Sequence, residues 1–198
     1  MRHPALPALI LALTPVLPLA AQAPSPAPAA NPVVKIVTNY GAMTVELDPA
    51  AAPKSVANFL RYVKEGHYKG TVFHRVIDGF MIQGGGMDEN LVEKPAHEGI
   101  VNETAQALAA GLHNTRGTIA MARTADPNSA EDQFYINLAD NSESLDSGAY
   151  CPFGRVIAGM EVADAIAKVR TNFQKGMPNV PEFPVRIKDV QLVKPAAK

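Results

Sequence analysis

Alternating apolar and polar positions predict a chain built mainly from short β-strands. Residues 33–38 and 42–47 alternate in this way, and Asn39-Tyr40-Gly41 between them is typical of a hairpin turn. Further runs predict strands near residues 71–77, 81–83, 117–122, 133–138, 153–157 and 185–193. The last run alternates imperfectly, but it is the best candidate for the strand that closes the sheet.

Apolar positions three and four residues apart predict two helices. The first helix starts near residue 55, where the pattern i, i+3, i+4, i+7 is formed by Val56, Phe59, Leu60 and Val63. Gly66 is expected to end this helix, because glycine readily adopts the left-handed conformation found at helix C-termini. A second helix is predicted over residues 160–169, and residues 84–116 are expected to be mostly loop.

A single arginine interrupts the apolar strand predicted at residues 71–77. Strand alternation places Arg75 on the same face as Phe73 and Ile77, and this face is expected to be largely covered. Arginine is almost never fully buried without a partner. The local pattern leaves two interpretations open: Arg75 pairs with a nearby carboxylate, or it faces a ligand at the edge of an apolar pocket.

Three segments far apart in the chain carry specific motifs. Residues 73–85 read Phe-His-Arg-Val-Ile-x-Gly-Phe-Met-x-Gln-Gly-Gly. Residues 117–124 read Gly-Thr-Ile-Ala-Met-Ala-Arg-Thr and are followed by Asp-Gln-Phe-Tyr-Ile-Asn at 132–137; Leu145-Asp146 precedes a third motif at 153–162. In this order and spacing they resemble the cyclophilins, which are peptidyl-prolyl cis–trans isomerases. The resemblance covers about residues 33–193 and is strongest to the bacterial, periplasmic branch.

The resemblance implies a mostly β fold, namely a closed eight-stranded antiparallel barrel capped by two α-helices. Closure of the sheet is physically favourable because it removes exposed strand edges. Side chains fill the interior of such a barrel, so its ligand groove is expected on the outer surface.

The resemblance also implies a set of site residues. The catalytic positions are Arg75, Phe80 and Gln83. The substrate-binding positions are Met81, Ala122, Arg123, Gln133, Tyr135, Leu145 and Tyr150. Rotation about a peptide bond needs a hydrogen-bond donor and an apolar slot, without a nucleophile or proton transfer. No cofactor and no metal are expected, because the five histidines include no i, i+4 pair and no cysteine cluster accompanies them.

The chain departs from the family pattern near the predicted groove. Ser144 stands where many eukaryotic relatives carry a tryptophan that binds cyclosporin, so weak cyclosporin binding is expected. Tyr135 replaces the usual phenylalanine and adds a hydroxyl that needs a partner. Asp132 replaces the usual serine and is a candidate partner for Arg75 or Arg123.

Length, charge and cysteine content narrow the class of protein. The 198 residues fit one domain with extensions, and the net charge of −1 comes without a basic stripe, so no nucleic-acid partner is expected. A single cysteine, Cys151, excludes an intrachain disulfide. We expect a monomer whose partners are Pro-containing polypeptides.

The N-terminal segment differs from the rest of the chain. Arg2 and His3 precede an apolar, almost uncharged stretch, which predicts a secretory signal over residues 1–23, a Pro/Ala-rich linker over 24–32 and periplasmic localisation. A plain Pro/Ala tail is the alternative, and the cleavage position stays open. The isomerase domain is expected at residues 33–193, followed by a tail at 194–198. No stable membrane insertion is expected after removal of the signal.

Two functions from different classes fit the predicted groove. The first is an exported proline isomerase that assists protein folding. The second is a chaperone-like binding module that holds extended Pro-containing segments, with turnover incidental. An assembly subunit with a dead site is a third possibility, but no site residue is visibly disabled.

Overall fold

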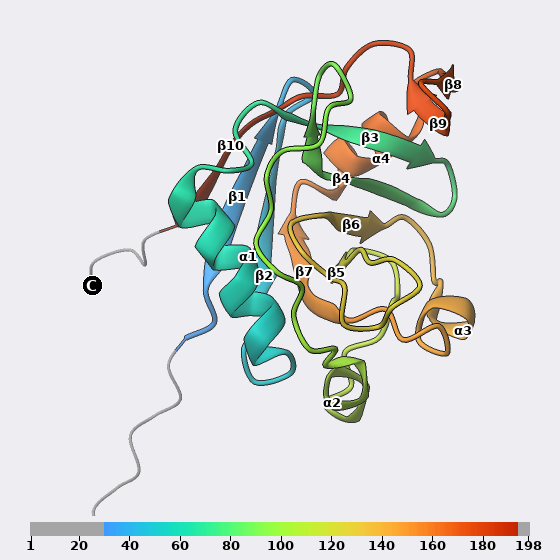
Figure 1. Cartoon of the computed structure of the whole chain (residues 1–198). Helices are drawn as coiled ribbons and strands as arrows, with labels where there is room; N and C mark the ends of the chain where they lie inside the picture. Colours follow the sequence, from blue (N-terminus) through green and yellow to red (C-terminus); the bar gives the residue numbers. More distant parts are fainter. Residues whose placement is uncertain (1–29, 194–198) are drawn as a thin grey trace, which may run out of the picture.

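A computed structural model describes residues 30–193 and arranges eight strands in one antiparallel sheet (Figure 1). These strands are β1 (Val33–Thr38), β2 (Ala42–Leu47), β3 (Thr71–Ile77), β4 (Met81–Asp88), β5 (Thr118–Met121), β6 (Phe134–Asn137), β7 (Pro152–Ala158) and β10 (Ile187–Val193). Their order across the sheet is β10-β1-β2-β7-β5-β6-β4-β3. The predicted signal, the C-terminal tail and residues 24–29 of the predicted linker lie outside the described residues.

The outer strands of this order, β10 and β3, meet and close the sheet into a barrel. The Phe73 N–H donates to the carbonyl of Val185 at 2.9 Å. Val72 forms an isolated antiparallel bridge with Arg186, just before β10 begins. The ring is thus completed by a short bridge rather than a full ladder. The predicted mostly β, eight-stranded antiparallel barrel is confirmed.

Four helices accompany the sheet: the two predicted helices are confirmed, and two short ones were not predicted. The two expected helices are α1 (Pro53–Glu65) and α4 (Met160–Ala167), and Gly66 ends α1 in the left-handed conformation with φ 69°. The additional elements are α2 (Thr104–Ala109), α3 (Ser142–Leu145) and a hairpin of β8 (Thr171–Gln174) and β9 (Met177–Pro181). Each of these elements has six residues or fewer, which is too short for a helical or strand period to stand out in the sequence.

Strand β4 runs past its predicted end at Gln83, through three glycines, to Asp88. Gly84 permits this course because β3 approaches closely: a Cβ atom at this position would lie 2.5 Å from the carbonyl oxygen of Val72. The segment expected to be loop therefore starts later than predicted.

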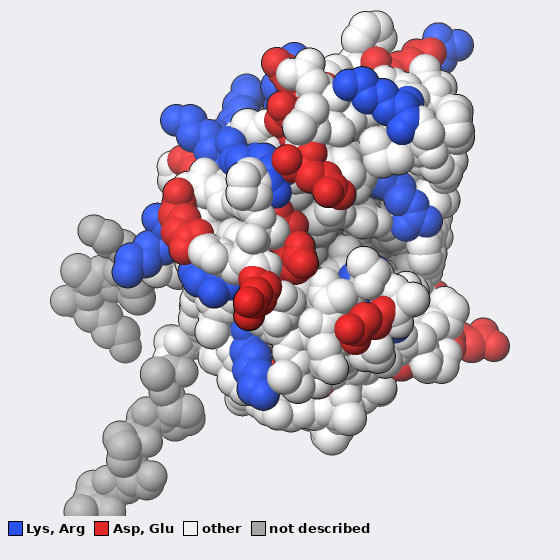
Figure 2. Space-filling view, viewed as in Figure 1, with Lys and Arg blue, Asp and Glu red and all other residues white. Residues whose placement is uncertain are grey.

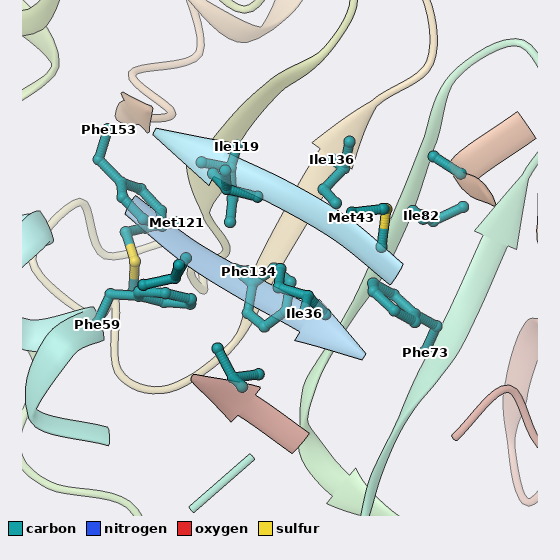
Figure 3. Close-up of a cluster of buried hydrophobic side chains, with 14 of the residues drawn as sticks. Ile36, Met43, Phe59, Phe73, Ile82, Ile119, Met121, Phe134, Ile136 and Phe153 are labelled. Carbon is teal, nitrogen blue, oxygen red and sulfur yellow. The ribbon is translucent and has the colours of Figure 1, made fainter. Parts of the chain in front are cut away.

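Apolar side chains fill the barrel interior (Figure 3). Phe59 from α1, Phe73 from β3 and Phe134 from β6 are fully buried. The ring of Phe134 meets Phe59 and Phe73 edge-on, at centroid distances of 5.5 and 5.9 Å. Because this interior is packed, a peptide has to bind on the outside of the barrel.

An irregularity in the β3–β4 ladder reverses the facing of Arg75. Phe73 pairs with Gly84 while Arg75 pairs with Gln83, so two steps along β3 match one step along β4. This β-bulge interrupts the alternation of side chains. Phe73 consequently points into the barrel core, whereas Arg75 and Ile77 lie on the outer side. The prediction that these three residues share one face is therefore wrong.

His74, within the bulge, is expected to make the protein sensitive to acid. It is 5 % exposed, and its Nδ1 has no hydrogen-bond partner among residues 30–193. Burial, assisted by the nearby Arg75 charge, lowers its pKa from 6.5 to about 4. Between these two values the unfolded chain binds a proton that the folded protein excludes. This group alone should therefore lower the free energy of unfolding by about 2–3 kcal/mol as the pH falls from 6.5 to 4.

Denaturant unfolding of the wild type and of His74→Gln across this pH range measures the effect. The variant should lose less stability in acid than the wild type, because glutamine takes up no proton. An identical pH dependence for both proteins would show that His74 is not the responsible group.

Candidate active site

Nine of the ten predicted site residues line one hollow on the outer side of the barrel. The hollow has a volume of about 190 Å³. Its lining consists of Arg75, Phe80, Met81, Gln83, Ala122, Arg123, Tyr135, Leu145 and Tyr150. The tenth residue, Gln133, lines an adjacent hollow and is hydrogen-bonded to Gln83. The fold thus brings together residues that are up to 75 positions apart, from Arg75 to Tyr150.

One side of the hollow is an apolar slot that is separate from the barrel core. Its buried members are Met81, Ala120, Ala122, Tyr135 and Leu145. Phe80 and Tyr150 are half-buried and pack at its rim. Strands β4, β5 and β6 carry most of the slot, while the short helix α3 contributes Leu145. A small apolar ring could enter this slot and leave water behind.

The other side of the hollow is polar and contains Arg75. Arg75 Nη1 donates to Gln83 Oε1 at 3.2 Å, and Gln83 Nε2 donates to Gln133 Oε1 at 3.1 Å. Among residues 30–193, none of the ion pairs includes Arg75. Of the two interpretations left open by the sequence, the geometry therefore favours a ligand-facing arginine over a structural ion pair.

Arg123 is held against the rim of the hollow by its own surroundings. Its guanidinium lies 4.3 Å from the centre of the Tyr150 ring. Its Nε donates to the Ala149 carbonyl at 3.1 Å, and its Nη2 donates to the Gly148 carbonyl. With its donors engaged in this way, Arg123 shapes the wall of the slot by holding Tyr150 in place.

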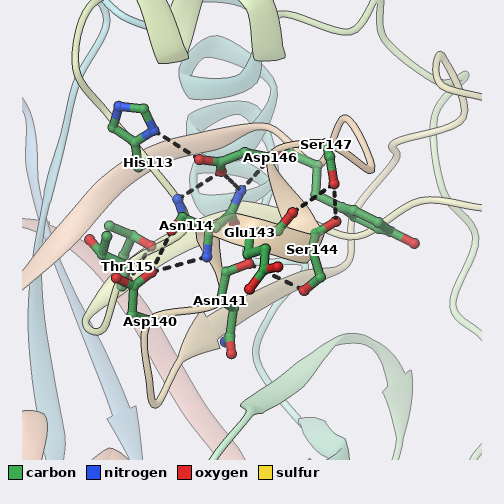
Figure 4. Close-up of polar contacts among 12 residues, drawn as sticks. His113, Asn114, Thr115, Asp140, Asn141, Glu143, Ser144, Asp146 and Ser147 are labelled. Atoms are coloured by element: carbon green, nitrogen blue, oxygen red, sulfur yellow. Dashed lines mark hydrogen bonds and ion pairs between the residues drawn. The ribbon is translucent and has the colours of Figure 1, made fainter.

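Asn114, which was not predicted as a site residue, holds the side chain of Tyr135 in the wall of the slot. The Tyr135 hydroxyl donates to Asn114 Oδ1 at 2.8 Å, which supplies the partner that this hydroxyl needs. Burial, together with the neighbouring Tyr150, raises the pKa of the Tyr135 hydroxyl well above its ordinary value, so the donor stays protonated. Asn114 Nδ2 in turn donates to Asp146 Oδ1 at 2.8 Å, at the end of α3 (Figure 4).

No signal in the sequence could have identified Asn114. It lies in the segment without periodicity, outside the three motifs, and its role follows only from contacts across the fold.

A second hollow of about 280 Å³ adjoins the first, and Gln83 lines both; together the two hollows form the groove. Its lining adds four polar residues that the sequence did not suggest: Glu93, Thr124, Ser129 and Glu131. Asp132 also borders it, but the expected pairing with Arg75 or Arg123 is wrong. Asp132 Oδ2 instead contacts His67 Nε2 at 2.8 Å, because the buried Asp132 side chain points to the turn after α1.

Charged side chains of both signs are interspersed on the face shown in Figure 2. In the described part of the chain, no group of three or more His, Cys, Asp or Glu side chains is placed to hold a metal ion. Over the same residues, none of the helices is long and apolar enough to cross a membrane.

The chain matches known proteins along almost all of the described region. The family model for "Cyclophilin type peptidyl-prolyl cis-trans isomerase/CLD" matches residues 33–192. A peptidyl-prolyl cis-trans isomerase of Acinetobacter baylyi is 49% identical over 166 residues, which are 82% of this chain and 86% of the relative. Peptidyl-prolyl cis-trans isomerase A of Dickeya dadantii is 43% identical over 94% of this chain and 97% of its own.

Solved structures agree with the sequence relatives. A Cryptosporidium parvum cyclophilin type peptidyl-prolyl cis-trans isomerase, crystallised in the presence of the dipeptide Ala-Pro, superposes with a TM-score of 0.68. It is 29% identical and covers 82% of this chain and 99% of its own. A matching family model, close relatives and a shared barrel lead to one conclusion: the chain belongs to the cyclophilin family and is a peptidyl-prolyl cis–trans isomerase.

Proposed function

We propose that the protein binds Pro-containing polypeptides with the proline ring in the apolar slot, and that Arg75 donates to the prolyl nitrogen as the bond rotates. The observation that carries this proposal is that Arg75 and the slot line the same hollow. The side-chain partner of Arg75 is the neutral amide of Gln83, which leaves its positive charge unneutralised. The Ala-Pro dipeptide named with the Cryptosporidium relative supports the same class of ligand.

The electronic change during rotation explains why a donor at this place accelerates the reaction. Amide resonance gives the peptide bond a rotation barrier of about 18–20 kcal/mol and leaves its nitrogen electron-poor. Twisting the bond breaks the resonance and returns a lone pair to nitrogen. A donor aimed at that nitrogen therefore binds the twisted form better than either planar isomer, which is the condition for catalysis.

The size of this effect requires both the donor and the slot. A hydrogen bond to a charged group contributes about 1.5–3 kcal/mol, which corresponds to about ten- to a few-hundredfold in rate. The remaining acceleration has to come from excluding water and from holding the ring while the preceding carbonyl turns. In this proposal Gln83 binds the substrate backbone, and Phe80, Met81 and Leu145 hold the ring.

A comparison of two assays separates the isomerase from a chaperone-like binding module. The wild type is tested for isomerisation of an Xaa-Pro peptide and for suppression of aggregation of an unfolded protein. Isomerisation at low enzyme concentration is expected. Suppression of aggregation without turnover would favour the binding module.

We further propose that the protein acts on exported polypeptides in the periplasm and helps them to fold. The support is the pattern of residues 1–32, with a cation before an apolar stretch and a Pro/Ala-rich linker after it. Sequencing the N-terminus of the mature protein and locating it by cell fractionation test this proposal. An intact Met1 on protein confined to the cytoplasm would overturn it.

Cyclosporin is expected to inhibit this protein only weakly. Ser144, in α3, ends in a short hydroxyl that donates to the Asn141 carbonyl at 3.3 Å, so it offers no aromatic surface to a bulky apolar ligand. Introducing Ser144→Trp should strengthen binding by about tenfold or more, which corresponds to roughly 1.4 kcal/mol. Inhibition of isomerisation during titration measures both proteins. Nanomolar inhibition of the wild type would contradict the expectation.

A further inference from the structure

A buried His–Asp pair lies behind the groove, outside the hollow that contains Arg75. His67 Nε2 contacts Asp132 Oδ2 at 2.8 Å, and the two side chains are only 8% and 5% exposed. The His67 ring also packs on Tyr62, with the centroids 4.8 Å apart. His67 lines neither of the two hollows, so any effect on a bound peptide has to pass through other residues.

This pair fixes the start of strand β6. The Asp132 side chain is held by His67, and its main-chain carbonyl accepts a hydrogen bond from the Tyr68 hydroxyl at 3.0 Å. The next residue is Gln133, whose side chain packs on Gly86. A Cβ atom at Gly86 would lie 2.5 Å from Gln133 Cγ, so the glycine is required for this close contact. Gln133 is thereby held at its backbone and along its side chain.

Gln133 stabilises the orientation of the Gln83 amide that Arg75 requires. Arg75 carries only donors, so the oxygen of the Gln83 amide has to face it. The amide nitrogen of Gln83 then points the other way and needs an acceptor, which is Gln133 Oε1 at 3.1 Å. Rotating the Gln83 amide by half a turn would place a donor against a donor on the Arg75 side. The Gln133 acceptor therefore stabilises the orientation that holds the guanidinium.

We propose that His67, Asp132 and Gln133 are positioning residues for Arg75, acting in series through the Gln83 amide. The proposal rests on the function proposed above for Arg75. Gln83 provides the one side-chain hydrogen bond that Arg75 makes within residues 30–193. A long, half-buried side chain with a single side-chain hydrogen bond depends on that bond for the direction of its guanidinium. A misplacement of roughly 1 Å can lower a rate up to a hundredfold.

Four variants test this series. Gln133→Met removes the acceptor at similar volume, whereas Gln133→Glu keeps an acceptor in place. His67→Phe keeps an aromatic ring beside Tyr62 but leaves Asp132 without its partner. His97→Phe is the matched control: His97 also packs on Tyr62, at 5.2 Å, and also contacts a carboxylate, Glu65 at 2.9 Å, but this exposed pair lines neither hollow.

The readouts separate positioning from binding and from stability. The constants kcat and KM are determined for an Xaa-Pro peptide, the Arg75 Nε–H resonance is followed by NMR, and thermal unfolding verifies folding. Gln133→Met and His67→Phe should lower kcat by about tenfold with little change in KM, and both should shift the Arg75 resonance. His97→Phe should retain most of kcat and leave the resonance in place, whereas Gln133→Glu should lose less of kcat than Gln133→Met because it keeps an acceptor.

Several results would overturn the inference. Folded Gln133→Met with wild-type kcat and an unmoved Arg75 resonance would do so, even if His67→Phe proved too unstable to measure. An equal loss in His97→Phe would reduce the effect to general loosening of the wall around Tyr62. An inactive wild type would instead refute the proposed function itself, so the two failures are distinguishable.

Discussion

Replacing Arg75 by alanine should lower kcat/KM for isomerisation of an Xaa-Pro peptide by about ten- to a few-hundredfold. Two arginines line the hollow. The guanidinium of Arg123 donates to the main-chain carbonyls of Ala149 and Gly148, whereas that of Arg75 donates to the neutral amide of Gln83 and remains available to a substrate. The loss should appear mainly in kcat, since the donor interacts with a lone pair that exists only in the twisted bond.

Arg75→Lys and a folding test provide the controls for this result. Lysine keeps the positive charge but lacks the planar fork that can hold Gln83 and reach a substrate at the same time, so an intermediate activity is expected. Circular dichroism and thermal unfolding show whether the variants are folded. A folded Arg75→Ala protein with most of its activity would remove Arg75 from the catalytic role.

Replacing Glu103 by alanine should lower the free energy of unfolding by about 3–5 kcal/mol. Helix α1 begins without a cap of its own, because Ala52 at its N-cap has no side-chain acceptor. The missing acceptors are provided by the buried side chain of Glu103, which directly precedes α2. Its Oε1 accepts the Lys54 N–H at 2.9 Å, and its Oε2 accepts the Ser55 N–H at 2.8 Å. Alanine would leave both donors without this partner at the positive end of the helix, and the Ser55 N–H is buried.

Thermal and denaturant unfolding measure this loss, which corresponds to roughly 10 °C in Tm for a protein of this size. Glu103→Gln keeps one acceptor oxygen and should lose about half as much stability. Glu98 is exposed, so Glu98→Ala is the matched control and should stay within about 0.5 kcal/mol of the wild type. A change below about 1 kcal/mol for Glu103→Ala would show that water replaces the carboxylate.

The elements that the sequence predicted well are those in which one face is buried along a regular period. The strands at residues 33–38 and 42–47 were predicted with their observed bounds, because each alternates cleanly between the core and the outside. Helix α1 was predicted equally well, because it has four apolar residues on one side and a glycine at its end. Helices α2 and α3 and the hairpin β8–β9 are too short to contain a period.

The site could be predicted as a set of residues but not as a set of contacts. The motifs gave the positions that line the hollow, because family resemblance preserves positions along the chain. Partners far apart were not foreseeable: Asp132 bonds His67, which lies 65 residues away, and Tyr135 bonds Asn114. The prediction that Arg75 shares a face with Phe73 was also wrong. A β-bulge interrupts the alternation of side chains between the two faces of a strand, and the sequence of the strand does not reveal it.

A crystal structure with a bound Xaa-Pro peptide would test directly whether Arg75 donates a hydrogen bond to the prolyl nitrogen. The proline ring should lie in the apolar slot, with a guanidinium nitrogen of Arg75 within about 3.5 Å of the prolyl nitrogen. The Gln83 amide should still accept from Arg75 in that complex. A proline bound elsewhere, or a guanidinium turned away to an acidic side chain and out of reach of the peptide, would contradict the account.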